Sequence, residues 1–97
     1  MKIDFNKPVL DLKNEEIKNV GMAELVTNII GALTTKDLKT MQKQAGWLKE
    51  LLADGTLELD KAGVTDFKEV IVASEQPLFI KAQIFDTVDG NKESDNK

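Results

Sequence analysis

Apolar residues in the middle of the chain recur at steps of three and four, the spacing of one face of an α-helix. The longest such stretch covers residues 35–53, and we expect it to form the central helix of the fold. A regular apolar face is normally removed from water, so we expect this one to be buried in the core. The apolar stripe consists of Leu38, Met41, Ala45, Leu48 and Leu52.

The same helix has a second apolar side, where Trp47 and Leu51 lie with Lys36, Lys39 and Lys43. Two interpretations stay open. We favour the first, in which the N-terminal arm covers Trp47 and the lysines only keep the face hydrated, because Trp is highly buried on average. In the second, Trp47 anchors an acidic partner surface that the lysines bind.

Apolar spacing predicts three further helices, at residues 21–33, 61–74 and 77–88. Pro77 suits the first turn of the last of these, since its missing N–H would have no intrahelical partner there. That helix is apolar on more than one side, so we expect it to be central or shared between subunits of a homo-oligomer. Phe79 and Gln83 are its candidate partner contacts.

Shorter signals predict strands and helix ends. Residues 9–12 and 17–20 flank a turn at Asn14, which tolerates the left-handed backbone of a tight hairpin. Residues 56–59 alternate polar and apolar, and we expect this short strand to pair with the N-terminal arm. Gly55 suits a helix C-cap and Asp60 an N-cap.

These elements predict a single α+β domain, mainly α, with about four helices in a small bundle, a short N-terminal β-hairpin and a third short strand. The length of 97 residues, with 41% hydrophobic and 31% charged residues, fits one globular domain. We assign it to residues 1–88. Residues 89–97 contain no large apolar side chain, so we expect a disordered C-terminal tail.

Composition narrows the chemistry. The chain has no Cys and no His, which removes Ser–His and Cys–His nucleophiles and nearly all transition-metal sites. We therefore expect no enzyme, no catalytic residue, no metal and no cofactor. No apolar run approaches the roughly 18 residues of a membrane span, so we expect a complete, cytoplasmic chain that does not enter membranes.

Charge bears on the partner. The formal net charge is −4, and an acidic protein is poorly suited to neutralising the phosphates of duplex nucleic acid. Nucleic acid remains the alternative partner, bound by a helical regulator through Lys36, Lys39, Lys43 and Lys49. An enzyme would need two carboxylates brought together in a cleft, and we expect it least.

Several stretches together resemble small accessory proteins encoded in tailed-phage and prophage genomes. They are KIDFNKPVLDL at residues 2–12, AELVTNIIGAL at 23–33, GTLELD at 55–60 and LFIKAQIFD at 78–86. Proteins of this group often have Gly in the hairpin turn where this chain has Asn14. The resemblance implies a phage-encoded accessory protein in the host cytoplasm.

On this basis we expect a non-enzymatic protein-protein interaction module. Its partner would be a phage protein, which it would assist as a tail assembly chaperone, or a host protein. The candidate partner-binding residues are Lys36, Lys39, Lys43, Trp47, Phe79 and Gln83.

Overall fold

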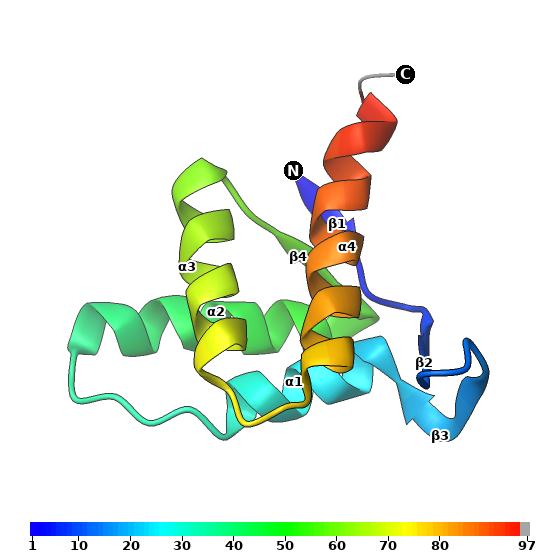
Figure 1. The fold of residues 1–97 in the computed structure, drawn as a ribbon. Coiled ribbons are helices and arrows are strands. Elements are labelled where there is room, and N and C mark those ends of the chain that lie inside the picture. Colours follow the sequence, from blue (N-terminus) through cyan, green and yellow to red (C-terminus); the bar gives the residue numbers. More distant parts are fainter. Residues whose placement is uncertain (96–97) are drawn as a thin grey trace.

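The computed structural model describes the backbone of residues 1–95 and the side chains of residues 1–18 and 20–90. Within these residues the chain forms an α+β fold, mainly α, as the sequence predicted (Figure 1). Helices α1 and α2 run beside each other, and α3 and α4 stand across them. In chain order the elements are β1 (Lys2–Asp4), β2 (Pro8–Leu10), β3 (Glu16–Gly21), α1 (Met22–Gly31), α2 (Leu38–Asp54), β4 (Thr56–Glu58), α3 (Lys61–Ala73) and α4 (Leu78–Asp95).

The strands form two separate antiparallel pairs. β2 and β3 make the expected hairpin, and Asn14 in its turn has a φ of 63°. β4 pairs with β1, which places Ile3 opposite Leu57. The prediction that the short strand after α2 pairs with the N-terminal arm is therefore confirmed.

The predicted caps at the end of α2 and the start of α3 are confirmed. Gly55 ends α2 with a φ of 75°, and the Asp60 carboxylate accepts the N–H of Gly63 at 2.7 Å. The predicted start of α2 at residue 35 is wrong, because Asp37 is its N-cap. The Asp37 carboxylate accepts the backbone N–H of Thr40 at 3.2 Å, and the helix begins at Leu38.

The Asp37 cap should make the stability of α2 depend on pH. The Thr40 hydroxyl and backbone N–H donate to the Asp37 carboxylate and lower its pKa below the ordinary value of 3.8. Because the pKa of Asp37 is lower in the folded protein than in the unfolded chain, the cap contributes its full stability to α2 at pH values above the ordinary pKa. This contribution is lost as the pH falls through the lowered pKa of the folded protein. In a carboxyl NMR titration we expect Asp37 to titrate below 3.8.

The variant Thr40→Val removes the hydroxyl but keeps the backbone N–H, so the Asp37 midpoint should rise toward its ordinary value. Thr65→Val is the matched control, because the Thr65 hydroxyl donates to the Lys61 carbonyl of another helix. An Asp37 midpoint that Thr40→Val leaves unchanged would show that the hydroxyl does not hold the carboxylate.

Aromatic rings from three distant parts of the chain meet in the core. The ring centroids of Phe5 and Phe67 lie 5.6 Å apart, and Trp47 meets Phe67 edge to face at 5.8 Å. Phe67 thereby joins the N-terminal arm and α2 to α3. The buried apolar residues are Ile3, Phe5, Val9, Met22, Val26, Ile29, Ile30, Trp47, Leu51, Leu57, Leu59, Phe67, Ile71, Ile84 and Val88.

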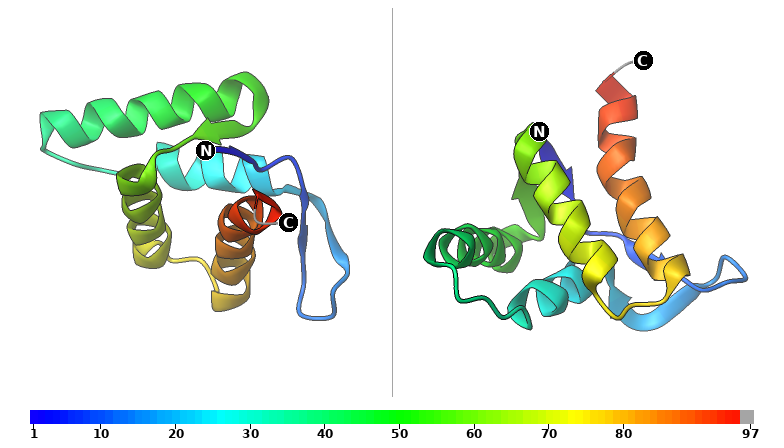
Figure 2. Two further views of the ribbon diagram at one scale, coloured as in Figure 1. Left: turned by 90° about the horizontal axis from the view of Figure 1, so that it is seen from above. Right: turned by 60° about the vertical axis from the view of Figure 1, so that its left-hand side comes forward.

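The prediction for the buried face of α2 is wrong. Of the apolar stripe, Leu38, Met41 and Leu52 are 63%, 50% and 68% exposed. Ala45 is exposed as well, and Leu48 is half-buried. Helix α2 lies along one edge of the molecule and leaves a long side uncovered (Figure 2).

The side of α2 that faces the core is the one with Trp47 and Leu51, which are 5% and 4% exposed. It is buried because Phe67 of α3 packs against Trp47. The interpretation of Trp47 as a core residue is thus confirmed, but the ring against it comes from α3.

Helix α4 packs on the core through Ile80, Ile84, Phe85 and Val88. Ile84 and Val88 are buried, whereas Leu78 is 80% exposed. The helix continues beyond residue 88, and Asp89 pairs with Lys68 of α3 at 2.7 Å. Residues 96–97 of the expected tail lie outside the described residues. Among the described residues, we find no helix with the length and apolar character of a membrane span.

Candidate functional site

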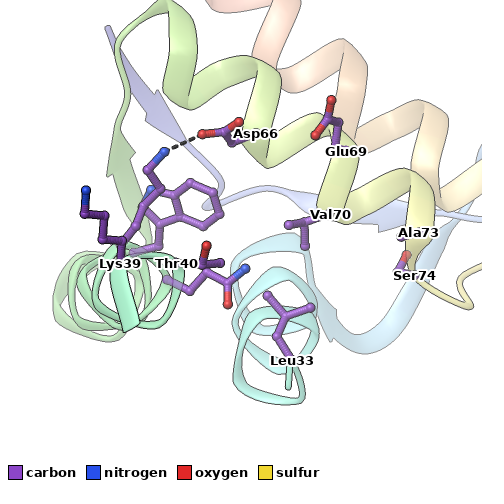
Figure 3. Close-up of a pocket in the computed structure, with 11 residues that line it drawn as sticks. Leu33, Lys39, Thr40, Asp66, Glu69, Val70, Ala73 and Ser74 are labelled. Carbon is purple, nitrogen blue, oxygen red and sulfur yellow. Dashed lines mark hydrogen bonds and ion pairs between the residues drawn. The ribbon is translucent and has the colours of Figure 1, made fainter. Parts of the chain in front are cut away.

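A groove of about 470 Å³ lies between α2 and α3 and reaches the end of α1 (Figure 3). Residues of α2 and α3 form its two walls, and Trp47, which lines it, contacts Phe67 of α3 edge to face. Its lining residues are Leu33, Lys39, Thr40, Lys43, Gln44, Trp47, Asp66, Glu69, Val70, Ala73 and Ser74.

The groove has an apolar part made by side chains from three helical segments. Leu33 follows α1, Trp47 comes from α2, and Val70 comes from α3. Leu33 and Val70 are half-buried and pack against the core, while Trp47 is almost fully buried. Leu33 and Val70 therefore supply most of the accessible apolar surface among these three residues of the groove.

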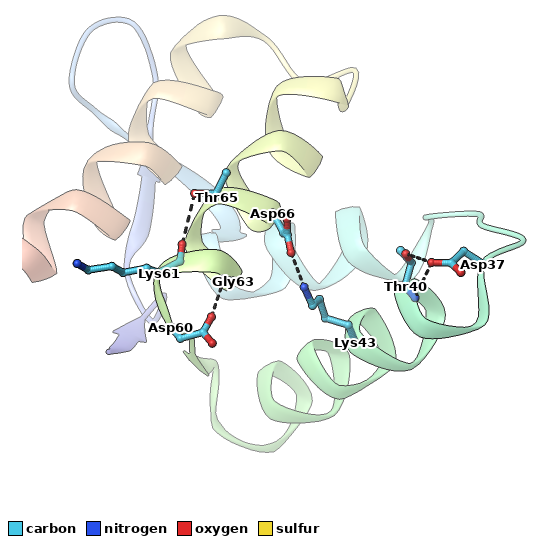
Figure 4. Close-up of polar contacts among 8 residues, drawn as sticks. All are labelled: Asp37, Thr40, Lys43, Asp60, Lys61, Gly63, Thr65 and Asp66. Atoms are coloured by element: carbon cyan, nitrogen blue, oxygen red, sulfur yellow. Dashed lines mark hydrogen bonds and ion pairs between the residues drawn. The ribbon is translucent and has the colours of Figure 1, made fainter.

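Charges of both signs stand around this apolar part. Lys43 of α2 forms an ion pair with Asp66 of α3 across the groove (Figure 4). The hydrogen bond to Asp66 raises the pKa of Lys43 above its ordinary 10.5. Lys39 and Glu69 add one charge of each sign to the lining.

The acidic residues in the groove decide whether the lysines of α2 form a basic surface. Because Asp66 neutralises Lys43 and Glu69 lies in the same groove, the lysines do not form a uniformly basic surface here. Neutralising successive phosphates requires such a surface. The described lining of this groove therefore lacks the uniformly basic surface that binding to a phosphate backbone requires.

The structure brings together three of the six candidate partner-binding residues. Lys39, Lys43 and Trp47 line the groove, while Lys36 is exposed in the connection before α2. Phe79 and Gln83 belong to α4, outside the groove. Their partner-binding role stays a prediction.

The side chain of Gln83 already has a role within the fold. Its Nε2 donates to the carbonyl of Leu10 at 2.7 Å, and its Oε1 accepts the N–H of Leu10 at 2.8 Å. The amide thus continues the hydrogen bonding of the hairpin, as a neighbouring strand would. Gln83 ties β2 to α4.

Sequence reasoning missed the α3 wall of the groove. Asp66, Glu69 and Ala73 recur at steps of three and four, which places them on one side of α3. That spacing is typical of any solvated helix face, and nothing in it indicates that the face lies opposite α2. The signal exists only in the tertiary structure.

Among the described residues that line the groove, we recognise no catalytic set. Among the residues that the structure describes, no group of three or more His, Cys, Asp or Glu side chains could hold a metal ion. Its charged residues are Lys39, Lys43, Asp66 and Glu69, with one ion pair already formed. Comparison of the chain with protein-family models, curated proteins and solved structures finds no match.

Proposed function

We propose that this chain is a non-enzymatic protein-protein interaction module that takes a segment of another protein into the α2–α3 groove. The observation that carries the proposal is the combination of an apolar part with charges of both signs in one preformed groove. Sites that bind by shape and a few polar contacts have this composition.

The groove sets requirements on the segment. Its volume of about 470 Å³ suits one or two apolar side chains against Leu33 and Val70. A carboxylate on the segment can pair with Lys39, and a basic group can pair with Glu69. Such rim pairs fix orientation and contribute little affinity, so the buried apolar anchor supplies most of it.

The resemblance to small phage accessory proteins supports a setting in the cytoplasm of an infected host cell. There the segment would belong to a phage tail protein, which the module keeps soluble during assembly, or to a host protein that the module inhibits. Both roles use the groove in the same way.

The test compares two substitutions on α3. Ala73→Arg fills the groove from an exposed lining position, whereas Val72→Arg places the same group at an adjacent exposed position outside the lining. Each variant is used to capture proteins from infected cells, which are quantified by mass spectrometry. We expect partners recovered by the wild type and Val72→Arg to fall by about tenfold or more with Ala73→Arg.

Circular dichroism checks that both variants keep the fold. Equal recovery by Ala73→Arg and Val72→Arg, or no partner for the wild-type protein, would overturn the proposal.

A further inference from the structure

The α2–α3 groove adjoins a second depression of about 380 Å³. The two hollows share Leu33, Ala73 and Ser74. Lys39 and Ser74 lie at opposite ends of the groove (Figure 3), so a segment that leaves the groove past Ser74 enters the depression. The other residues that line the depression are Asn28, Ile29, Ala32, Glu75 and Gln76.

The depression lies where two helices end. Helix α1 ends at Gly31 and α3 ends at Ala73, and residues from the last turn of each line the depression. The last carbonyl groups of a helix have no partner within the helix, and the helix dipole places about half a negative charge at this end. Both helices therefore place a partial negative charge beside the depression.

A carboxylate adds a full negative charge to the same place. Glu75 is exposed and lines the depression, and Glu69 lines the adjoining groove. Among the described side chains, neither carboxylate takes part in an ion pair. None of the described residues that line the depression is basic. The end of the groove past Ser74 is therefore acidic, whereas Lys39 lies at its opposite end.

The end of α3 already binds one ammonium group of this chain. The Nζ of Lys81, from α4, donates to the carbonyl of Val72 in the last turn of α3 at 2.8 Å. Lysines commonly bind the last carbonyl groups of a helix in this way. Lys81 does not line the depression, so it leaves the carboxylate of Glu75 and the end of α1 accessible to a cation from another molecule.

We propose that the segment bound in the groove carries a Lys or Arg close to its apolar anchor, and that this basic side chain enters the depression beside Glu75. The inference rests on the proposed function and names the chemistry of its partner. With the apolar anchor against Leu33 and Val70, the basic group lies past Ser74. An acidic group there would meet the Glu75 carboxylate and two negative helix ends, so repulsion excludes it.

Selection from a library of random peptides displayed on yeast tests the proposal. Peptides that bind the full-length wild type but not Ala73→Arg, which fills the groove, are groove ligands. We expect each of these ligands to combine an apolar residue with a nearby Lys or Arg. The variant Glu75→Lys should instead select ligands with Asp or Glu in place of the basic residue, because its charge is reversed.

Asp86→Lys on α4 is the matched control. It makes the same change of charge at an exposed position that lines neither hollow, so it should select the wild-type ligands. A ligand selected on the wild type should bind Glu75→Lys about tenfold or more weakly than Asp86→Lys, since an attraction is replaced by a repulsion. Circular dichroism checks that each variant keeps the fold.

The outcomes separate this inference from the proposed function. Groove ligands that lack a basic residue, or that Glu75→Lys binds as tightly as the wild type does, overturn the inference and leave the proposed function standing. If no peptide distinguishes the wild type from Ala73→Arg, both are overturned.

Discussion

Replacing Phe67 with Ala is expected to lower the free energy of unfolding by about 3–5 kcal/mol, the range for removing a buried aromatic side chain. Phe67 is fully buried and contacts both Phe5 and Trp47. Its loss leaves a cavity where three segments of the chain meet. Domains of this size have about 5–15 kcal/mol of stability, so the variant should lose a large fraction of it.

Urea denaturation followed by tryptophan fluorescence measures this loss, since Trp47 is the single Trp and lies against Phe67. Val72→Ala on the same helix is the matched control. Val72 is 59% exposed, and its truncation should change the stability by at most about 0.5 kcal/mol. A cost for Phe67→Ala no greater than that of the control would show that the ring cluster is not the centre of the core.

Gly55→Ala is expected to cost about 2 kcal/mol or more. Gly55 has a φ of 75°, a conformation that costs any residue with a Cβ. An added Cβ would also overlap the side-chain amide of Asn6. That amide cannot move away without loss, because its Nδ2 donates to the carbonyl of Asp54 at 2.7 Å.

Gly46→Ala is the opposing control within α2. Gly46 is in the helix interior, and its added Cβ meets nothing within 4 Å, so this variant should gain up to about 1 kcal/mol. The two free energies of unfolding, measured by urea denaturation, should therefore change in opposite directions. If the two variants changed the free energy of unfolding equally, the left-handed backbone at Gly55 would not be the reason that this position requires glycine.

Features fixed by neighbouring residues could be predicted from the sequence. Asn14 marks the hairpin turn, Gly55 the end of α2 and Asp60 the start of α3 because each acts on backbone groups within a few positions of itself. The α+β class follows from such signals taken together.

The buried face of α2 could not be predicted, because periodicity shows where apolar residues gather and not which side meets the rest of the chain. Leu38 and Leu52 belong to the more regular pattern, yet they are exposed. Trp47 is buried because it meets Phe67, which is twenty residues further along the chain (67 − 47). The side of α2 that faces the core is therefore the one whose large Trp47 side chain packs against the ring of Phe67.

Only the α2 wall of the groove could be predicted from the sequence. Its α2 wall, with Lys39 and Lys43, stood out as a basic helix side in the sequence. Asp66 could not be linked to Lys43, since the packing of α2 against α3 depends on contacts that no local pattern records.

The pairing of β1 with β4 has a consequence for the order in which the protein folds during synthesis. Residues 2–4 are made long before residues 56–58, their partner strand. Until then the nascent chain exposes Ile3 on this unpaired strand and Phe5 just after it. An unpaired strand is prone to pair with other chains. A ribosome paused within α2 therefore holds a chain that cannot close its core, and folding follows only when β4 and α3 have emerged.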